Sequence, residues 1–162
     1  MRSARNINLI DFKKGNFVLL GTTRSNPWVE LFEPEMNFRF LVTDEKTGRT
    51  GFRNVRPRAG EKDVYMVEGD PRAPDETYSV VAVVPNLSRN GSVLMIGGAT
   101  GEGTEAAGEF ITNPEAVQQA LRTMNAVENG RVRNFEMLLK SGTIGGASKN
   151  AAVVAYRLIP GA

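Results

Sequence analysis

The sequence predicts a single α/β domain over residues 1–162: a mixed, twisted, Rossmann-like three-layer sheet with about three helices and a C-terminal β-hairpin. Three observations support this class. Short apolar stretches end repeatedly at Gly or Pro, as buried strands do. Two Asn-Pro pairs open helical patterns. The length of 162 residues, with 41% hydrophobic residues, suits one domain with one core.

The first elements follow from local signals near the N-terminus. Asn16–Leu20 is apolar and ends at Gly21, which predicts a buried strand. Asn26 is a good N-cap and Pro27 suits the first helical position, where no backbone donor is needed. A short helix over 27–32 is therefore expected. Strand, polar turn and capped helix in this order are typical of the entry to a Rossmann-like unit.

The middle of the chain predicts mainly strands and turns. Phe38, Phe40 and Val42 alternate with other residues, which indicates a half-buried strand. A turn over 44–48 and a surface connection over 69–76 are expected, because they contain Gly and Pro. Tyr78–Val84 is apolar at consecutive positions and predicts a strand covered on both faces. Further strands are expected over 49–55, 64–68 and 93–96.

The C-terminal half predicts two helices and a hairpin. The helices are expected over 104–111 and 114–124, the second because its apolar residues recur at helical spacing. Strands are expected over 135–139 and 152–158. The loop between them is too short for a parallel crossover, so the two strands should pair antiparallel.

Composition removes several classes of chemistry. The chain has no His and no Cys, which excludes Ser-His-Asp and Cys-His nucleophile systems, Cys/His zinc sites and disulfides. Carboxylates that hold a calcium ion follow an Asp-x-Asp pattern, which the sequence lacks. We therefore expect no metal and no cofactor.

The charge pattern and the apolar stretches bear on partners and location. The net charge is only +2, and the nearest approach to a basic cluster is Arg49, Arg53, Arg56, Arg58 and Lys62. Phe52 is the one aromatic residue interleaved with them, which favours a solvated hairpin and loop over a nucleic-acid surface. We therefore expect that this domain does not bind nucleic acid. No apolar stretch approaches the ~20 residues of a spanning helix, and none has signal-peptide character. A cytoplasmic location is the default expectation.

A first candidate binding loop follows the first predicted strand. It consists of Thr22, Thr23, Arg24, Ser25 and Asn26. Ligands bind at such strand-to-helix turns because backbone N–H groups and the helix dipole converge there. The loop carries an arginine and no acid, which favours an anion. The alternative is a capped helix start with a surface arginine.

A second candidate loop is rich in glycine and follows the strand expected over 93–96. Its candidate binding residues are Gly98, Thr100, Gly101, Gly103, Thr104 and Glu105. Four glycines in 97–103 suggest a close backbone approach or several positive φ angles. The spacing fits neither a Walker A loop nor G-x-G-x-x-G. Glutamates at the helix start repel phosphate, so a sugar, ribose or amine suits this loop better. The alternative is a flexible loop before an acidic helix.

Glutamates provide the one plausible catalytic set. Glu102, Glu105 and Glu109 share one helical face, and a carboxylate pair there would serve acid–base chemistry on a nucleoside or glycoside. Glu136 and Asp11 are candidates for a second carboxylate, but no sequence spacing places either of them near these glutamates. The alternative is a solvated helix face. Trp28, the only tryptophan, is expected to pack in the core, with a ligand-stacking wall as the alternative.

The chain also resembles a known group of proteins. The residues that carry the resemblance are Val18–Gly21, Arg24–Trp28, Gly97–Gly98, Gly103–Phe110, Phe135–Lys140 and Val153–Tyr156. Together they resemble a C-terminal domain of uncharacterised proteins from acidobacterial-type soil bacteria. The resemblance implies that the chain is the C-terminal part of a larger regulatory protein with a neighbouring domain, and it assigns no functional residue.

Without His and Cys, the chemical groups near the two loops are backbone amides, hydroxyls, an arginine and glutamates. Such groups bind a ligand more readily than they catalyse its reaction. The sequence therefore favours a sensory module that binds a small polar or nucleotide-like ligand. A glutamate-dependent enzyme and a protein-interaction module are the alternatives.

Overall fold

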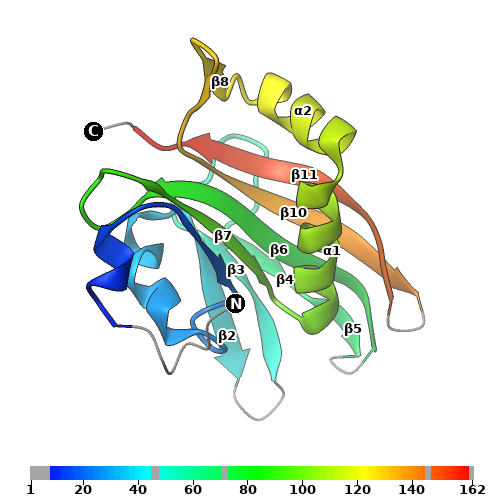
Figure 1. Ribbon diagram of the computed structural model, residues 1–162. Helices are drawn as coiled ribbons and strands as arrows, with labels where there is room; N and C mark the ends of the chain where they lie inside the picture. The colour runs from blue at the N-terminus through cyan, green and yellow to red at the C-terminus, as the bar shows by residue number, and fades with distance from the viewer. Residues whose placement is uncertain (1–7, 45–47, 71–72, 145–146, 161–162) are drawn as a thin grey trace.

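The computed structural model describes residues 8–44, 48–70, 73–144 and 147–160 (Figure 1). The 3-10 helices are η2 (Asp11–Lys13), η3 (Pro27–Leu31) and η4 (Glu33–Glu35), and the α-helices are α1 (Gly101–Thr112) and α2 (Pro114–Thr123). The strands are β1 (Phe17–Leu20), β2 (Phe38–Asp44), β3 (Arg49–Asn54), β4 (Val64–Met66), β5 (Glu68–Asp70), β6 (Ala73–Pro85), β7 (Ser92–Gly98), β8 (Val127–Glu128), β9 (Arg131–Val132), β10 (Phe135–Ile144) and β11 (Ala147–Leu158).

The main sheet has six strands in the order β1-β7-β6-β10-β11, with β5 attached to β6. Among the described strands only β1 and β7 pair in parallel, and every other pairing is antiparallel. The expected C-terminal hairpin is confirmed by β10 and β11, which pair antiparallel. The mixed α/β class is also confirmed.

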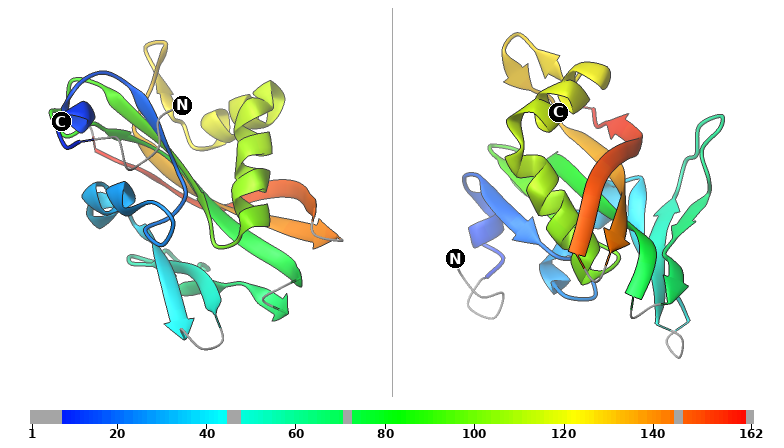
Figure 2. Two further views of the ribbon diagram at one scale, coloured as in Figure 1. Left: turned by 60° about the horizontal axis from the view of Figure 1, so that its bottom comes forward. Right: turned by 90° about the vertical axis from the view of Figure 1, so that its right-hand side faces the viewer.

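The expected three-layer Rossmann-like arrangement is not clearly present. Helices α1 and α2 cover one face of the main sheet, whereas the 3-10 helices and the small sheet β2-β3-β4 cover the other (Figure 2). Two core clusters separate accordingly: Phe110, Met124 and Leu139 belong to the cluster under the helices. Phe38 and Phe52 belong to the cluster under the small sheet. Two α-helices are described where about three helices were expected, because the segment after Asn26 forms a short 3-10 helix.

Both Asn-Pro signals mark real helix starts. Asn26 Oδ1 accepts from Trp28 N, and Asn113 Oδ1 accepts from Glu115 N and Ala116 N. Helix α1 begins at Gly101, earlier than expected, because Thr100 Oγ1 accepts from Gly103 N at 3.2 Å and so provides the N-cap.

The C-terminal hairpin is longer than the sequence predicts. The loop expected between these two strands is largely strand, because β10 and β11 remain paired up to Ile144 and Ala147 across two shifts in register. The tip at 145–146 lies outside the described residues, as do 45–47 of the expected turn and 71–72 of the expected connection. Within the described part of the chain, neither α-helix is long and apolar enough to cross a membrane.

Candidate functional site

Both candidate loops lie at one edge of the main sheet. Because β1 runs parallel to β7, with Leu20 opposite Ile96, the two strands end side by side. The pairing continues into the loops, where Gly21 N donates to Ile96 O at 2.8 Å. A Cβ on Gly97 would lie 2.5 Å from the carbonyl oxygen of Gly21, so the two backbones are in contact. The structure therefore brings together two loops that lie far apart in the sequence.

Most polar groups of the first loop hold the loop itself. Ser25 Oγ accepts from Thr22 N at 3.1 Å and donates to Thr22 O at 3.3 Å. Asn26 Nδ2 donates to Leu20 O at 3.0 Å, while its Oδ1 caps η3. Thr22 is buried. These bonds fix the turn, so Thr22, Ser25 and Asn26 act as its frame.

Arg24 and Thr23 are the first-loop residues that this frame leaves available. Arg24 is exposed and Thr23 is half-buried. Among the described residues, no carboxylate forms an ion pair with Arg24. An exposed guanidinium is a suitable partner for a phosphate or a carboxylate.

The glycines of the second loop are explained by packing within the protein rather than by contact with a ligand. None of Gly97, Gly98, Gly101 and Gly103 has a positive φ. A Cβ on Gly98 would lie 2.2 Å from Thr104 N, and one on Gly103 would lie 2.9 Å from Tyr78 O. The close approach that the sequence suggests is therefore an approach of β7 and α1 to the protein's own backbone. Gly101 is exposed and has nothing within 4 Å of its Cβ position.

The threonines of this loop are also engaged within the protein. Thr104 Oγ1 accepts from Gly98 N at 3.0 Å and donates to Thr100 O at 3.2 Å. Thr100 Oγ1 lies 2.9 Å from Thr77 Oγ1, in addition to its capping bond. Both hydroxyls thus tie the start of α1 to the sheet.

The candidate glutamates project from the first three turns of α1 and lie largely outside the core. Glu102 is half-buried, and Glu105 and Glu109 are exposed. Glu102 stands in the first turn, where a negative charge interacts favourably with the helix dipole. None of the three lines the cavity that lies behind the loops.

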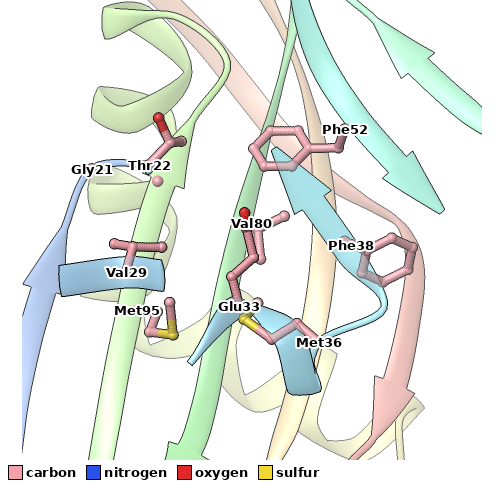
Figure 3. A pocket seen from close by; sticks show the side chains of 10 residues that line it. Gly21, Thr22, Val29, Glu33, Met36, Phe38, Phe52, Val80 and Met95 are labelled. Carbon is pink, nitrogen blue, oxygen red and sulfur yellow. The ribbon is translucent and has the colours of Figure 1, made fainter. Parts of the chain in front are cut away.

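That cavity has a volume of about 20 Å³, which is room for about one water molecule. The loops contribute Gly21, Thr22 and Gly97, and the remaining lining side chains are mainly apolar (Figure 3). Glu33 of η4 is the acidic group at its wall. Burial raises the pKa of Glu33, while the bond that Phe40 N donates to Glu33 Oε1 at 2.8 Å opposes that rise.

Sequence reasoning missed Glu33, because no local pattern distinguishes it from the exposed acids Glu30 and Glu35 beside it. Glu33 is half-buried because η4 brings its carboxylate against β2, where Phe40 N donates to it. Trp28 packs as expected: it is half-buried against the core, and its ring centroid lies 4.8 Å from that of Phe12.

Glu136 and Arg157 belong to a polar network, away from the two loops. Glu136 is 1% exposed and accepts from Asn37 N at 2.7 and 2.9 Å and from Phe38 N at 3.0 Å. Arg157 donates to both carboxylate oxygens of Glu61, at 2.9 and 2.5 Å. The network joins the small sheet to β10 and β11, which indicates a structural role for both residues.

No family model matches the chain, and neither a curated protein nor a solved structure matches it significantly.

Proposed function

We propose that this chain is a non-enzymatic binding or sensory module whose site is the shared edge formed by the loops at 21–26 and 97–104. The ligand is a small polar, nucleotide-like molecule. Its anionic group meets Arg24, and its hydroxyl or amino groups meet the start of α1, where Gly101 is exposed and Glu102 and Glu105 offer carboxylates. A regulatory role within a longer chain, as the resemblance implies, belongs to the same proposal.

One observation carries the proposal: the backbone contact between Gly21 and Gly97 places the two loops beside each other. The internal bonds of Thr22, Ser25, Thr100 and Thr104 then supply a rigid frame. Preorganised loops bind with a smaller loss of conformational entropy than loops that must order on binding.

The glutamate-dependent enzyme receives less support from the same geometry. Glu105 is exposed, and neither it nor Glu102 lines the cavity behind the loops. A general acid must lie within hydrogen-bonding reach of a bound substrate, and the cavity behind the loops presents neither glutamate.

Thermal-shift screening followed by calorimetric titration tests the binding proposal. Nucleoside mono-, di- and triphosphates, sugar phosphates and free amino acids are the probes. A ligand at 100 times its Kd stabilises the folded state by ~2.7 kcal/mol, which is readily measured. We expect at least one phosphate-bearing compound to shift Tm.

Arg24→Ala then separates specific from incidental binding. Loss of a charge-assisted hydrogen bond is expected to weaken the affinity by about 10–100-fold. Arg122→Ala is the matched control, because Arg122 is an exposed arginine on α2. The proposal fails if no probe shifts Tm, or if Arg24→Ala binds as tightly as the Arg122→Ala control.

A further inference from the structure

The outer face of the small sheet carries an arginine-rich surface that the proposed ligand site does not use. Side chains alternate along these strands, and the buried ones are Phe38, Phe52 and Tyr65. The opposite side of the sheet presents Arg39 and Leu41 from β2, Arg49 and Arg53 from β3, and Val64 and Met66 from β4. These six residues are called the arginine face below.

The strand register places like charges opposite each other on this face. Arg39 of β2 lies directly opposite Arg53 of β3, and Arg53 lies opposite Val64 of β4. Two cations in cross-strand positions repel each other and destabilise a sheet. The arrangement therefore has a cost in the isolated chain.

Apolar side chains occupy the middle of the face. Leu41, Gly51 and Met66 form the next row of the register, and all three are wholly or partly buried. A Cβ on Gly51 would lie 2.9 Å from Met66 Sδ, so the Met66 side chain lies over this glycine. An apolar centre with arginines at its margin is typical of protein–protein interfaces, in which Met and Arg are enriched.

Neighbouring carboxylates offset the positive charge of the face only in part. Arg53 is exposed and forms no ion pair with any carboxylate among the described residues. Among the described residues, the hydrogen bonds of Arg39 go to the backbone oxygens of Met36 at 3.0 Å and Pro34 at 2.6 Å, and its charge acts on the carboxylate of Glu33. Arg49 lies opposite Asp44 in the register. The nearby carboxylate of Glu61 is held by Arg157.

We propose that the arginine face docks an acidic segment of another protein in which carboxylates flank an apolar residue. The carboxylates pair with Arg39 and Arg53, and the apolar residue packs on Met66 and Leu41. Nucleic acid fits less well, because the rings of Phe40 and Phe52 pack edge to face at a centroid distance of 6.0 Å, and Phe52 is buried. The face therefore presents no aromatic platform for bases.

Selection from a phage-displayed library of random dodecapeptides tests the proposal with the full chain immobilised. Selected peptides are expected to be enriched in Asp and Glu around an apolar residue. Their affinity, measured by fluorescence anisotropy, should fall at least about tenfold with Arg53→Glu and markedly with Met66→Ser. Arg131→Glu, an exposed arginine of β9, is the control and should bind as the unmodified chain does.

Stability measurements on the same variant sharpen the test. Arg53→Glu replaces a like-charge pair by an opposite-charge pair with Arg39, so its Tm should equal or exceed that of the unmodified chain while binding is lost. Selection of peptides without acidic enrichment, equal binding by Arg53→Glu and Arg131→Glu, or failure to select any binder overturns the proposal. So does tighter binding of single-stranded or duplex DNA than of the selected peptides. Arg24→Ala should leave peptide binding unchanged, which separates this surface from the ligand site.

Discussion

At the scale of single residues, the buried Glu136 and the half-buried Glu61 show opposite responses to their surroundings. Glu136 is desolvated on β10, which raises its pKa despite the bonds from Phe38 N and Asn37 N. Glu61 accepts from Arg157, and this bond lowers its pKa to about 2. The two groups therefore contribute to stability with opposite dependence on pH.

The pH dependence of Glu61 can be tested directly. Since its pKa in the folded state lies below the ordinary value of 4.5, its contribution is present above pH 4.5 and is lost as the pH falls towards 2. Glu61→Gln should therefore cost about 1–3 kcal/mol at neutral pH and flatten the stability curve across that window. Urea denaturation at a series of pH values measures this, with Glu30→Gln, an exposed acid, as control. An unchanged acid limb would contradict the assignment.

Glu136 should show the reverse sign. Its raised pKa means that its contribution is fully present below the pKa of the unfolded chain and decreases as the pH rises through the folded-state pKa. Glu136→Ala leaves the buried N–H groups of Asn37 and Phe38 without an acceptor and should cost about 2–5 kcal/mol. Glu136→Gln keeps one acceptor oxygen and should cost less than the alanine variant. Equal losses for the two variants in urea denaturation would argue against this role.

At the scale of elements, the junction of β7 and α1 explains why the second loop is rich in glycine. Thr100 caps the helix, and Gly98 and Gly103 let the helix start lie directly on β6 and β7. The glycines are thus needed for packing within the protein, whether or not a ligand binds beside them.

Substitution of two glycines in this loop distinguishes packing from flexibility. Gly98→Ala forces a methyl group to 2.2 Å from Thr104 N and 2.5 Å from Gly103 C, so it should destabilise by about 1–3 kcal/mol or more. Gly101→Ala meets nothing within 4 Å at a helical position, so it should be neutral or stabilise by up to about 1 kcal/mol. Chemical denaturation of both variants measures the difference, and similar stabilities would refute the packing explanation.

At the scale of the whole molecule, the small sheet is attached to the main sheet by a few specific polar bonds in addition to its apolar core. Thr50 Oγ1 donates to Ala99 O at 2.7 Å, next to the proposed ligand site. Glu136 holds the start of β2, and Arg157 lies over the Phe38 ring at 5.2 Å while it pairs with Glu61. These contacts connect the layers on which the two proposed surfaces lie.

Weakening this attachment should make the small sheet unfold locally before the main sheet does. Arg157→Met removes the ion pair and leaves Glu61 without its partner. Hydrogen exchange measured by mass spectrometry should then quicken in β2 and β3, while β6 and β10 in the middle of the main sheet keep their protection. Arg133→Met is a control, since Arg133 pairs with Glu128 in the peripheral β8–β9 region. Uniform acceleration across both sheets would mean that the layers unfold as one unit.

The sequence by itself determined the positions of most elements. Asn26-Pro27 and Asn113-Pro114 mark helix starts through bonds within three residues, and such signals do not depend on the rest of the chain. The lack of His and Cys likewise settled which chemistry the chain does not use. The short 3-10 helix after Pro27 and the long β10–β11 hairpin differ from expectation, because packing and strand pairing overrode local preference.

Only the tertiary structure decided which groups remain available for a partner. In the sequence, the hydroxyls of Ser25, Thr100 and Thr104 cannot be distinguished from hydroxyls that bind a ligand. In the structure, each forms hydrogen bonds within the protein. Burial of Glu33 and Glu136 and the alignment of Arg39 with Arg53 arise from contacts across strands and layers. Because those contacts depend on how strands and layers pack, the composition and spacing of neighbouring residues do not predict them.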